Sequence, residues 1–181
     1  MFDITFPEEN EKQIAETAIK LKYKEVYFAY EEKKLPKEKF NIKGINTKIA
    51  LINPKNPSKA RKKADILIAD KEARHYIEKT DIDIIFGLEA KAKKDFMKQR
   101  NSGLNQVLCS IAAKRNKTYG FNFRDVLLAR NRHEIIGRMM QNMVLCKKYK
   151  VKTIFFSGAR TPLEMRNWRD MKSFFELLGR K

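Results

Sequence analysis

The chain has 181 residues, of which 43% are hydrophobic, and its formal net charge is +18. This composition predicts a single domain over residues 1–181 with a substantial core, and it excludes the disordered and fibrous classes. No apolar run approaches the roughly 18 to 20 residues that span a bilayer, and the first ten residues carry acids instead of the basic and apolar stretches of a secretory signal. We therefore expect a cytoplasmic protein with no membrane partner.

The charge is divided unevenly along the chain. Residues 1–90 hold 18 Lys and Arg against 16 Asp and Glu, whereas residues 91–181 hold 22 against 6. A field of this size in one half of a protein attracts a polyanion such as nucleic acid. A Lys-rich solubilising surface is the alternative, but a general bias of that kind should not spare the first half. Nucleic-acid binding is the favoured interpretation.

Strand and helix signals alternate along the chain, with no linker and no internal repeat. Helices are predicted between most of the strands, at residues 9–22, 58–63, 71–79, 102–116, 132–148 and 168–178. The strand signals are short runs rich in Ile, Val, Phe and Leu, which is typical of strands covered on both faces. Seven such runs predict strands at residues 2–6, 25–30, 44–52, 65–69, 83–86, 118–123 and 152–157.

Two of these helices show clear apolar periodicity. In the first, Ser102 is the expected N-cap, and Val107 belongs to the stripe expected to be buried. In the second, an Ile and Met stripe forms the expected core face, and Arg138 lies off it. Cys109 and Cys146 fall within these patterns and lack the spacing of zinc ligands, so we expect buried, reduced thiols.

Alternation of strands and helices predicts parallel crossovers, in either a barrel or a doubly wound sheet. No Gly-rich dinucleotide turn follows the first strand, which favours the barrel. Polar residues also follow the predicted strands, as expected for the ligand-binding face of a barrel. These residues are Asn53, Asp70, Arg100, Ser102, Asn122, Arg124, Ser157 and Arg160. We expect a TIM-barrel-like α/β fold with about seven parallel strands surrounded by helices, and its length leaves open whether the barrel is incomplete at its C-terminal end.

Catalytic motifs are scarce. The two histidines, His75 and His133, cannot form a His-based metal cluster, and there is no phosphate-binding P-loop or nucleophile elbow. A metal site made of carboxylates, with Asp3, Asp70 and Glu89 near strand ends, would give a metal-dependent phosphoesterase as the alternative function. The residues themselves favour no catalytic group and no metal or cofactor bound by the protein.

The basic residues, by contrast, form two groups. The first precedes the turn at 101–103 and comprises Lys91, Lys93, Lys94, Lys98 and Arg100. The second follows the last strand, with Arg160 close to Ser157 and then Arg166 and Arg169. Positive side chains beside exposed backbone N–H groups suit phosphates. We expect the cations of the second half to lie on one side of the barrel and to bind RNA there.

Three segments resemble a known family. They are residues 100–108 (RNSGLNQVL), 157–159 (SGA) and 165–171 (MRNWRDM), followed by Leu178 and Gly179. In order and spacing they are similar to ribonuclease P protein component 3, the archaeal and eukaryotic barrel subunit of ribonuclease P. That family is related to the polymerase-and-histidinol-phosphatase (PHP) type of metal-hydrolase barrel. The likeness covers about residues 1–179 and is weaker before residue 90.

The resemblance implies a PHP-type barrel that has lost the metal site of its relatives, with Asp3-Ile4-Thr5 where those relatives show His-x-His. It implies a ribonuclease P subunit that supports a catalytic RNA, itself the carrier of Mg²⁺, in removing the 5′ leader of precursor tRNA. Implied partners are the ribonuclease P RNA, ribonuclease P protein component 2 and the other protein subunits. The resulting RNA-binding candidates are Lys93, Lys94, Lys98, Arg100, Ser102, Asn105, Gln106, Lys114, Arg115, Arg124, Ser157, Arg160, Arg166 and Arg169.

The chain departs from the family pattern at two positions. Gln106 stands where members generally carry His, which removes a titratable donor but keeps a hydrogen-bonding side chain. Trp168 stands where members carry Pro, so a large ring replaces a pre-set helix start. Relatives also usually continue past Gly179 with another helical segment. A general RNA-binding or ribosome-binding protein remains a further alternative, which rests on charge alone.

Overall fold

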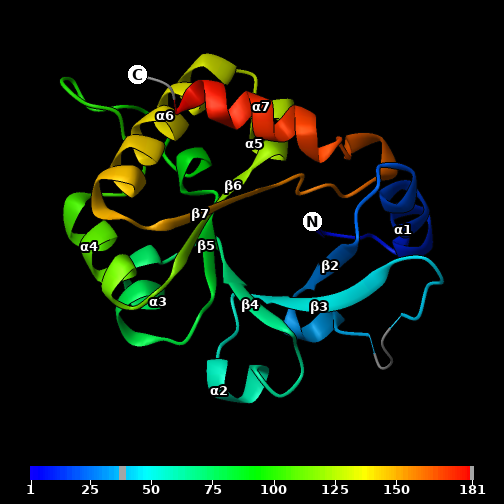
Figure 1. Ribbon diagram of the computed structural model, residues 1–181. Coiled ribbons are helices and arrows are strands. Elements are labelled where there is room, and N and C mark those ends of the chain that lie inside the picture. Colours follow the sequence, from blue (N-terminus) through cyan, green and yellow to red (C-terminus); the bar gives the residue numbers. More distant parts are fainter. Residues whose placement is uncertain (37–39, 180–181) are drawn as a thin grey trace.

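Seven parallel strands form one sheet, in chain order from β1 to β7 (Figure 1). The computed structural model describes residues 1–36 and 40–179. Each strand pairs with the next along the chain, as right-handed strand–helix–strand units require. The strands are β1 (Phe2–Thr5), β2 (Glu25–Tyr30), β3 (Asn46–Ile52), β4 (Ile66–Ala69), β5 (Ile84–Phe86), β6 (Thr118–Asn122) and β7 (Lys152–Phe156).

The sheet curls until its two edges meet. The segment just after β7 bridges to β1: the Gly158 amide donates to the Ile4 carbonyl at 3.1 Å, and the Phe6 amide donates to the Ala159 carbonyl at 2.8 Å. Gly158 has φ +63, and a Cβ on it would overlap the Asn122 side chain. A glycine is therefore required at this junction. The two hydrogen bonds between the edges make the barrel nearly closed.

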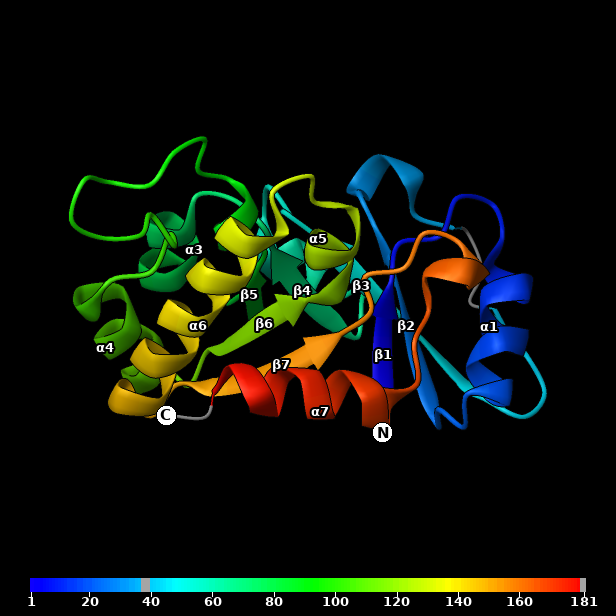
Figure 2. The same ribbon diagram turned by 90° about the horizontal axis from the view of Figure 1, so that it is seen from above.

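Helices surround the strands on the outside (Figures 1 and 2). In Figure 2, α7 lies alongside β7, between the chain start and the C-terminal end of α6. The α-helices are α1 (Glu11–Lys20), α2 (Pro57–Ala60), α3 (Ala73–Lys79), α4 (Gln106–Lys114), α5 (Phe123–Leu128), α6 (Arg132–Tyr149) and α7 (Trp168–Leu178). Short 3-10 turns are η1 (Glu32–Lys34), η2 (Leu88–Ala90) and η3 (Pro162–Glu164).

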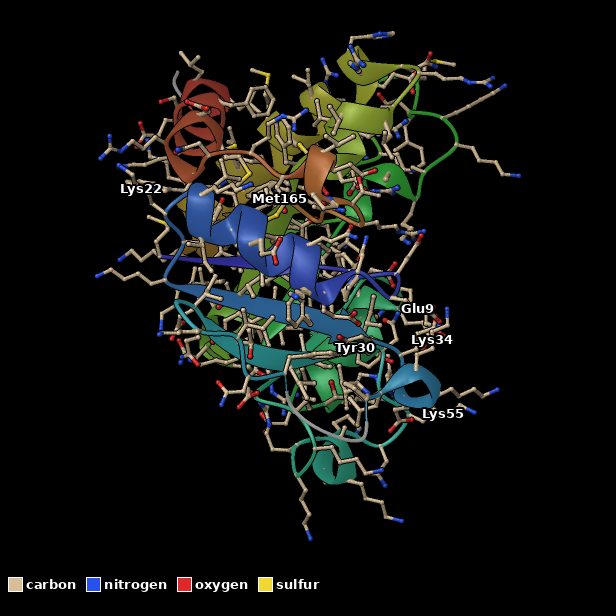
Figure 3. All side chains as sticks on the ribbon, turned by 90° about the vertical axis from the view of Figure 1, so that its right-hand side faces the viewer. Glu9, Lys22, Tyr30, Lys34, Lys55 and Met165 are labelled. Carbon is tan, nitrogen blue, oxygen red and sulfur yellow. The ribbon has the colours of Figure 1, made fainter. Side chains whose placement is uncertain are left out.

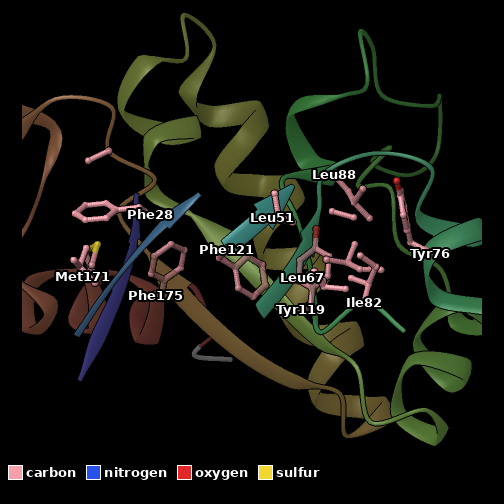
Figure 4. Packing of buried hydrophobic residues seen from close by; sticks show 14 of the residues in the cluster. Phe28, Leu51, Leu67, Tyr76, Ile82, Leu88, Tyr119, Phe121, Met171 and Phe175 are labelled. Atoms are coloured by element: carbon pink, nitrogen blue, oxygen red, sulfur yellow. The ribbon is translucent and has the colours of Figure 1, made fainter. Parts of the chain in front are cut away.

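The core has two parts, because alternate residues of each strand point to opposite faces. Inside the barrel, residues such as Ile4, Ile68 and Phe156 form one buried cluster. A larger cluster fills the layer between strands and helices, and Figure 4 follows it from Met171 and Phe175 of α7 to Tyr76 of α3. The strands are covered on both faces, as their apolar runs predict.

The barrel has two distinct ends. Strands run toward one end and the helices return toward the other, so residues after strands and residues after helices lie at opposite ends. Figure 3 shows this for the first crossover, with Glu9 at one end of α1 and Lys22 at the other. We call the end where the strands finish the barrel mouth.

The TIM-barrel-like fold and all seven strands are confirmed, each within two residues of its predicted bounds. Helix α5 was not predicted, because Phe123 prolongs the apolar run of β6. Its N-cap Asn122 accepts from the Arg124 amide. The cysteines are buried free thiols, as expected. Among the described residues, no helix is long and apolar enough to cross a membrane.

Three local predictions were wrong. Helix α4 begins at Gln106 with Asn105 as its N-cap, because the Ser102 hydroxyl is already hydrogen-bonded to Gln141. Val107 is 60% exposed, because the first turn of this later-starting helix points it to solvent. Arg138 is only 1% exposed, because a loop distant in sequence folds over it.

Candidate nucleic-acid interface

The barrel mouth contains a small cavity of about 170 Å³. Its walls come from the ends of six strands, β1 and β3 to β7, and the loops that follow them. This is the position expected for a ligand site in a barrel. The lining residues are Phe6, Ile52, Asp70, Phe86, Gly87, Ala90, Lys91, Asn122, Arg124, Asp125, Gly158 and Arg160. The mouth therefore brings together four of the residues that follow predicted strands: Asp70, Asn122, Arg124 and Arg160.

Each cation in the mouth is paired with an acid of the same chain. Lys91 Nζ lies 2.7 Å from Asp70 Oδ2. Arg124 Nε lies 2.8 Å from Glu164 Oε2, and Arg160 Nη1 lies 3.1 Å from Glu8 Oε1. These pairs reduce the positive potential that the mouth presents to a polyanion.

One carboxyl in the mouth is only half satisfied. Asp125 Oδ1 accepts from Asn122 Nδ2 at 3.0 Å, whereas Asp125 Oδ2 is buried and accepts no hydrogen bond from any described residue. Burial raises the pKa of Asp125 to about 6, despite the opposing charges of Lys91 and Arg124. The mouth is thus balanced between acids and bases.

Asp3 and Ser157 join the two edges of the barrel below the mouth. The Ser157 hydroxyl donates to Asp3 Oδ2 at 2.6 Å, and the Ser157 amide donates to Oδ1 at 2.7 Å. Burial raises the pKa of Asp3 to about 6, and the hydrogen bonds from Ser157 and Ile4 partly offset the rise. Ser157 is fully buried, so its role is to hold the barrel closed. It is not exposed to contact RNA.

Each of the three carboxylates of the alternative metal site has a different partner within the chain. Asp3 binds Ser157, Asp70 pairs with Lys91, and Glu89 accepts from Asn142 Nδ2 at 2.8 Å. Within residues 1–36 and 40–179, no three His, Cys, Asp or Glu side chains gather as metal ligands. This geometry gives no support to the carboxylate-metal phosphoesterase.

A long basic loop, residues 91–101, runs from η2 toward α4 and is anchored by Arg138. From α6, Arg138 Nε donates to Asp95 Oδ1 at 2.6 Å, and its Nη1 donates to the carbonyls of Ala92 and Glu89 at 2.8 and 3.1 Å. Asp95 Oδ1 also accepts from the Asn101 amide. The single acid of the loop is therefore occupied internally.

The lysines of this loop remain available. Lys93, Lys94 and Lys98 are exposed, and the structure records no ion pair for them with any described acid. Arg100 lies across α6 at Gly137, where a Cβ would overlap its guanidinium group. The basic loop thus presents three predicted cations to solvent, and no acid partner is recorded for them among the described residues.

Beside the loop lies a second cavity of about 450 Å³, which we call the amide pocket. It is formed by the loop, the start of α4 and one face of α6. Its lining includes the predicted residues Arg100, Ser102, Asn105 and Gln106. Ser102 is only 1% exposed and its hydroxyl accepts from Gln141, so the prediction that it contacts RNA was wrong. All the lining residues are Phe96, Gln99, Arg100, Asn101, Ser102, Gly103, Leu104, Asn105, Gln106, Gln141 and Leu145.

The remaining predicted cations lie elsewhere. Lys114 and Arg115 end α4, at the end of the barrel opposite the mouth, and Arg115 Nη1 donates to the Ile77 carbonyl at 3.4 Å. Arg166 precedes α7 and donates to the Leu163 and Met165 carbonyls. Arg169 lies over the Trp168 ring, 5.7 Å from its centroid.

The expectation that these cations gather on one side was therefore wrong. Charges counted along the chain say nothing about direction in the fold. Because the helices run antiparallel to the strands, the end of α4 and the end of β6 lie at opposite ends of the barrel. Sequence reasoning also missed Arg138, Asp125 and Gln141. The one local signal was that Arg138 and Gln141 fall on the same face of α6, three residues apart.

The family model of RNase P subunit p30 matches the chain over residues 1–181. The chain belongs to this family. Ribonuclease P protein component 3 of Methanosarcina acetivorans is 32% identical over 82 residues, which cover 44% of this chain and 34% of that protein. The Methanosarcina barkeri protein of the same name is 29% identical over 137 residues, covering 68% and 54%. The alignments thus span between about a third and about half of these curated relatives.

Two solved structures share the fold. A chain in the cryo-EM structure of archaeal ribonuclease P with mature tRNA superposes with a TM-score of 0.74 at 18% identity, covering 99% of this p30-family chain and 83% of that chain. Histidinol phosphate phosphatase from Lactococcus lactis, solved with zinc, L-histidinol and phosphate, gives 0.65 at 13% identity, covering 99% and 94%. The barrel expected from the sequence is confirmed, and its fold is shared with this phosphatase.

Proposed function

We propose that this chain is an RNA-binding subunit of ribonuclease P that supports the catalytic RNA during removal of the 5′ leader of precursor tRNA. The observation that carries the proposal, in a chain of the p30 family, lies in the basic loop. Its lysines Lys93, Lys94 and Lys98 are exposed and have no acid partners among the described residues, whereas the cations of the mouth are paired with acids of the same chain. Free cations at the protein surface attract RNA phosphates, and the counterions that those phosphates then release favour binding.

Catalysis is assigned to the RNA. In the polypeptide, the buried carboxyls Asp3 and Glu89 are hydrogen-bonded within the fold, and the described residues offer no cluster of metal ligands. Mg²⁺ would therefore be held by RNA phosphates, with the protein adding positive charge around them. This division of labour needs no catalytic residue on the chain.

Two regions would contact RNA. The basic loop with Arg100 forms the first, and its lysines act as point charges for phosphates. The second lies at the end of the barrel opposite the mouth, with Lys114 and Arg115 at the end of α4 and, apart from them, Arg166 and Arg169 at the start of α7. Their arginines present planar guanidinium groups. A folded RNA is large enough to reach both ends of the barrel. Proposed partners are the ribonuclease P RNA, protein component 2, the other protein subunits and precursor tRNA, assembled in the cytoplasm.

The first test identifies the RNA and measures the salt dependence of binding. RNA that copurifies with the chain is sequenced, and affinity for ribonuclease P RNA is measured over a range of salt concentrations. Replacing Lys93, Lys94 and Lys98 by Gln should lower the log–log salt slope by about 2 units, because each phosphate contact contributes roughly 0.7 to 0.9. A flat salt response of the unmodified chain, or copurification of ribosomal RNA alone, contradicts the proposal.

A matched control uses three lysines from the balanced half. Lys33, Lys34 and Lys55 are exposed, and no ion pair is recorded for them among the described residues. Their triple Gln variant removes the same charge and should leave the slope nearly unchanged. The second region is tested separately by reconstituting pre-tRNA cleavage with Arg166 and Arg169 changed to Glu; undiminished cleavage rejects these two positions.

A further inference from the structure

The amide pocket differs from the other cavities of the molecule in its chemistry. Acidic side chains line the barrel mouth and two further surface hollows. A fourth cavity, between α6, β7 and Gly179, is mainly apolar and carries Lys147 and Lys148. The amide pocket alone among these five combines side-chain amides, one arginine and an exposed aromatic ring, and no carboxylate lines it.

The aromatic ring belongs to Phe96, which is 57% exposed at the edge of the pocket. Its backbone amide donates to the Gln99 carbonyl at 2.9 Å, so a tight turn fixes where the side chain begins. The structure records no ring contact for Phe96 with any described aromatic residue. More than half of the residue is thus accessible to a planar partner.

The amides are oriented, and part of their hydrogen-bonding capacity is unused. Gln141 Nε2 donates to the Arg100 carbonyl at 3.2 Å and to Ser102 Oγ at 3.0 Å, which fixes the direction of its Oε1. No described residue bonds to Gln141 Oε1 or to the side chains of Gln99 and Gln106. Gln99 and Gln106 each offer both a donor and an acceptor, whereas Gln141 offers only its Oε1 as an acceptor, because both Nε2 hydrogens are used. A set of donors and acceptors matches the edge of a nucleobase.

The first turn of α4 is not the binding element. The Asn105 side chain accepts from the Leu108 amide at 2.9 Å, so the helix start is capped by its own chain. What remains for a ligand is the ring of Phe96 and the amide edges, with Lys93, Lys94 and Lys98 on the adjoining loop. These are the features by which proteins bind unpaired nucleotides: stacking, edge hydrogen bonds and nearby phosphate charges.

We propose that the amide pocket binds one unpaired nucleotide of a single-stranded RNA segment. The base stacks on Phe96, its edge pairs with Gln99, Gln106 and Gln141, and the flanking phosphates face the loop lysines. This inference rests on the proposed RNA-binding function and adds a specific site to it. An acidic protein partner is the competing occupant, because Met97 and Val107 are also exposed nearby. The free amides, which a partner's carboxylate would use only as donors, favour a base.

The test compares Phe96→Leu with the unmodified chain, using a mixed-sequence ten-nucleotide single-stranded RNA and, separately, ribonuclease P RNA. Leucine keeps an apolar side chain but removes the stacking face. Affinity for the oligonucleotide should fall about tenfold, with no change in salt slope, and Phe96→Trp should restore it. Met97→Leu is the matched control on the neighbouring exposed residue and should bind like the unmodified chain. Thermal melting should show all three variants folded.

The outcomes separate the two proposals. If the unmodified chain binds neither RNA, the proposed function fails. If it binds both RNAs and Phe96→Leu binds with unchanged affinity, the base pocket is wrong and the function stands. A photoreactive p-benzoylphenylalanine at position 96 gives the third readout in the assembled complex. Crosslinking to RNA supports the pocket, and crosslinking to a protein subunit overturns it in favour of protein docking.

Discussion

The barrel mouth and the amide pocket both lie beside loops that follow strands, but they differ in how their charges are balanced. In the mouth, Lys91, Arg124 and Arg160 each face a carboxylate of the same chain. In the amide pocket there is no carboxylate, and the loop lysines beside it have no recorded acid partner among the described residues.

This difference separates the position of a site from its chemistry. A barrel mouth is the usual place for a ligand. Here its ions are satisfied internally, so a polyanion gains little by entering it. The flank formed by residues 91–101, α4 and α6 has the unbalanced charge instead. A subunit that binds RNA on its flank can keep the barrel as a scaffold and leave the charges of the mouth paired with one another.

The largest effect is expected at Arg138, which anchors the basic loop to α6 on the flank. Arg138→Met should lower the free energy of unfolding by about 3 kcal/mol, because Asp95 and the Glu89 and Ala92 carbonyls lose a buried donor. Urea denaturation measures the change. The matched control Arg130→Met, at an exposed position with no recorded contact among the described residues, should change stability by less than about 0.5 kcal/mol.

Binding adds a second readout to this variant. At a temperature where Arg138→Met is folded, its affinity for single-stranded RNA should fall at least as far as that of Phe96→Leu, because the loop that carries Phe96 is released. A loss of less than about 1 kcal/mol in stability together with unchanged RNA affinity would show that the loop holds its shape without this arginine.

Glu89 lies between the two regions and should give the next largest effect. Burial raises its pKa from 4.5 to about 7, and hydrogen bonds from Asn142 and Tyr119 offset only part of the rise. The folded protein therefore keeps the Glu89 proton that the unfolded chain releases above pH 4.5. This contribution to stability is complete below that pH and is lost as the pH rises toward 7.

Glu89→Gln isolates this contribution, because the amide stays neutral at every pH. Compared with the unmodified chain, the variant should have similar stability near pH 4 and be more stable by about 3 kcal/mol at pH 8. Chemical denaturation of both proteins at several pH values gives the difference curve. If the difference does not change with pH, Glu89 is ionised in the folded protein and the raised pKa is wrong.

Most of the fold follows from local sequence. The seven strands are short apolar runs ended by charged or turn residues, and their order in the sheet follows from parallel crossovers. The start of α4 was misplaced because Ser102, a good N-cap by type, bonds Gln141 instead. Asn105 has the same capping chemistry three residues later, and only the tertiary partner of Ser102 decides between them.

The site was less predictable, because its pairing depends on contacts between distant segments. Glu8 meets Arg160 across nearly the whole chain, and Glu164 meets Arg124 across the barrel mouth. Neither acid is near its partner in sequence, so the cations of the mouth looked free. In the basic loop the charge run and the structure agree that Lys93, Lys94 and Lys98 are unpaired within the described residues, since the one acid of the loop, Asp95, is bonded by Arg138 and by the Asn101 amide. Charge runs indicate a polyanion partner, but only the fold shows which charges are free.

The smallest expected effect concerns Gly137, where Arg100 lies against α6. Gly137→Ala places a Cβ in the space now filled by the Arg100 guanidinium group. Alanine favours a helix interior by up to about 1 kcal/mol over glycine, and Arg100 is exposed enough to move into solvent. Stability measured by urea denaturation should therefore stay the same or rise slightly. RNA affinity should change less than threefold, because Arg100 keeps its charge and the amides and Phe96 are untouched. A loss of more than about 2 kcal/mol in the free energy of unfolding would mean that Arg100 makes a fixed structural contact with α6. Arg100 would then not count among the free cations that distinguish the flank from the mouth.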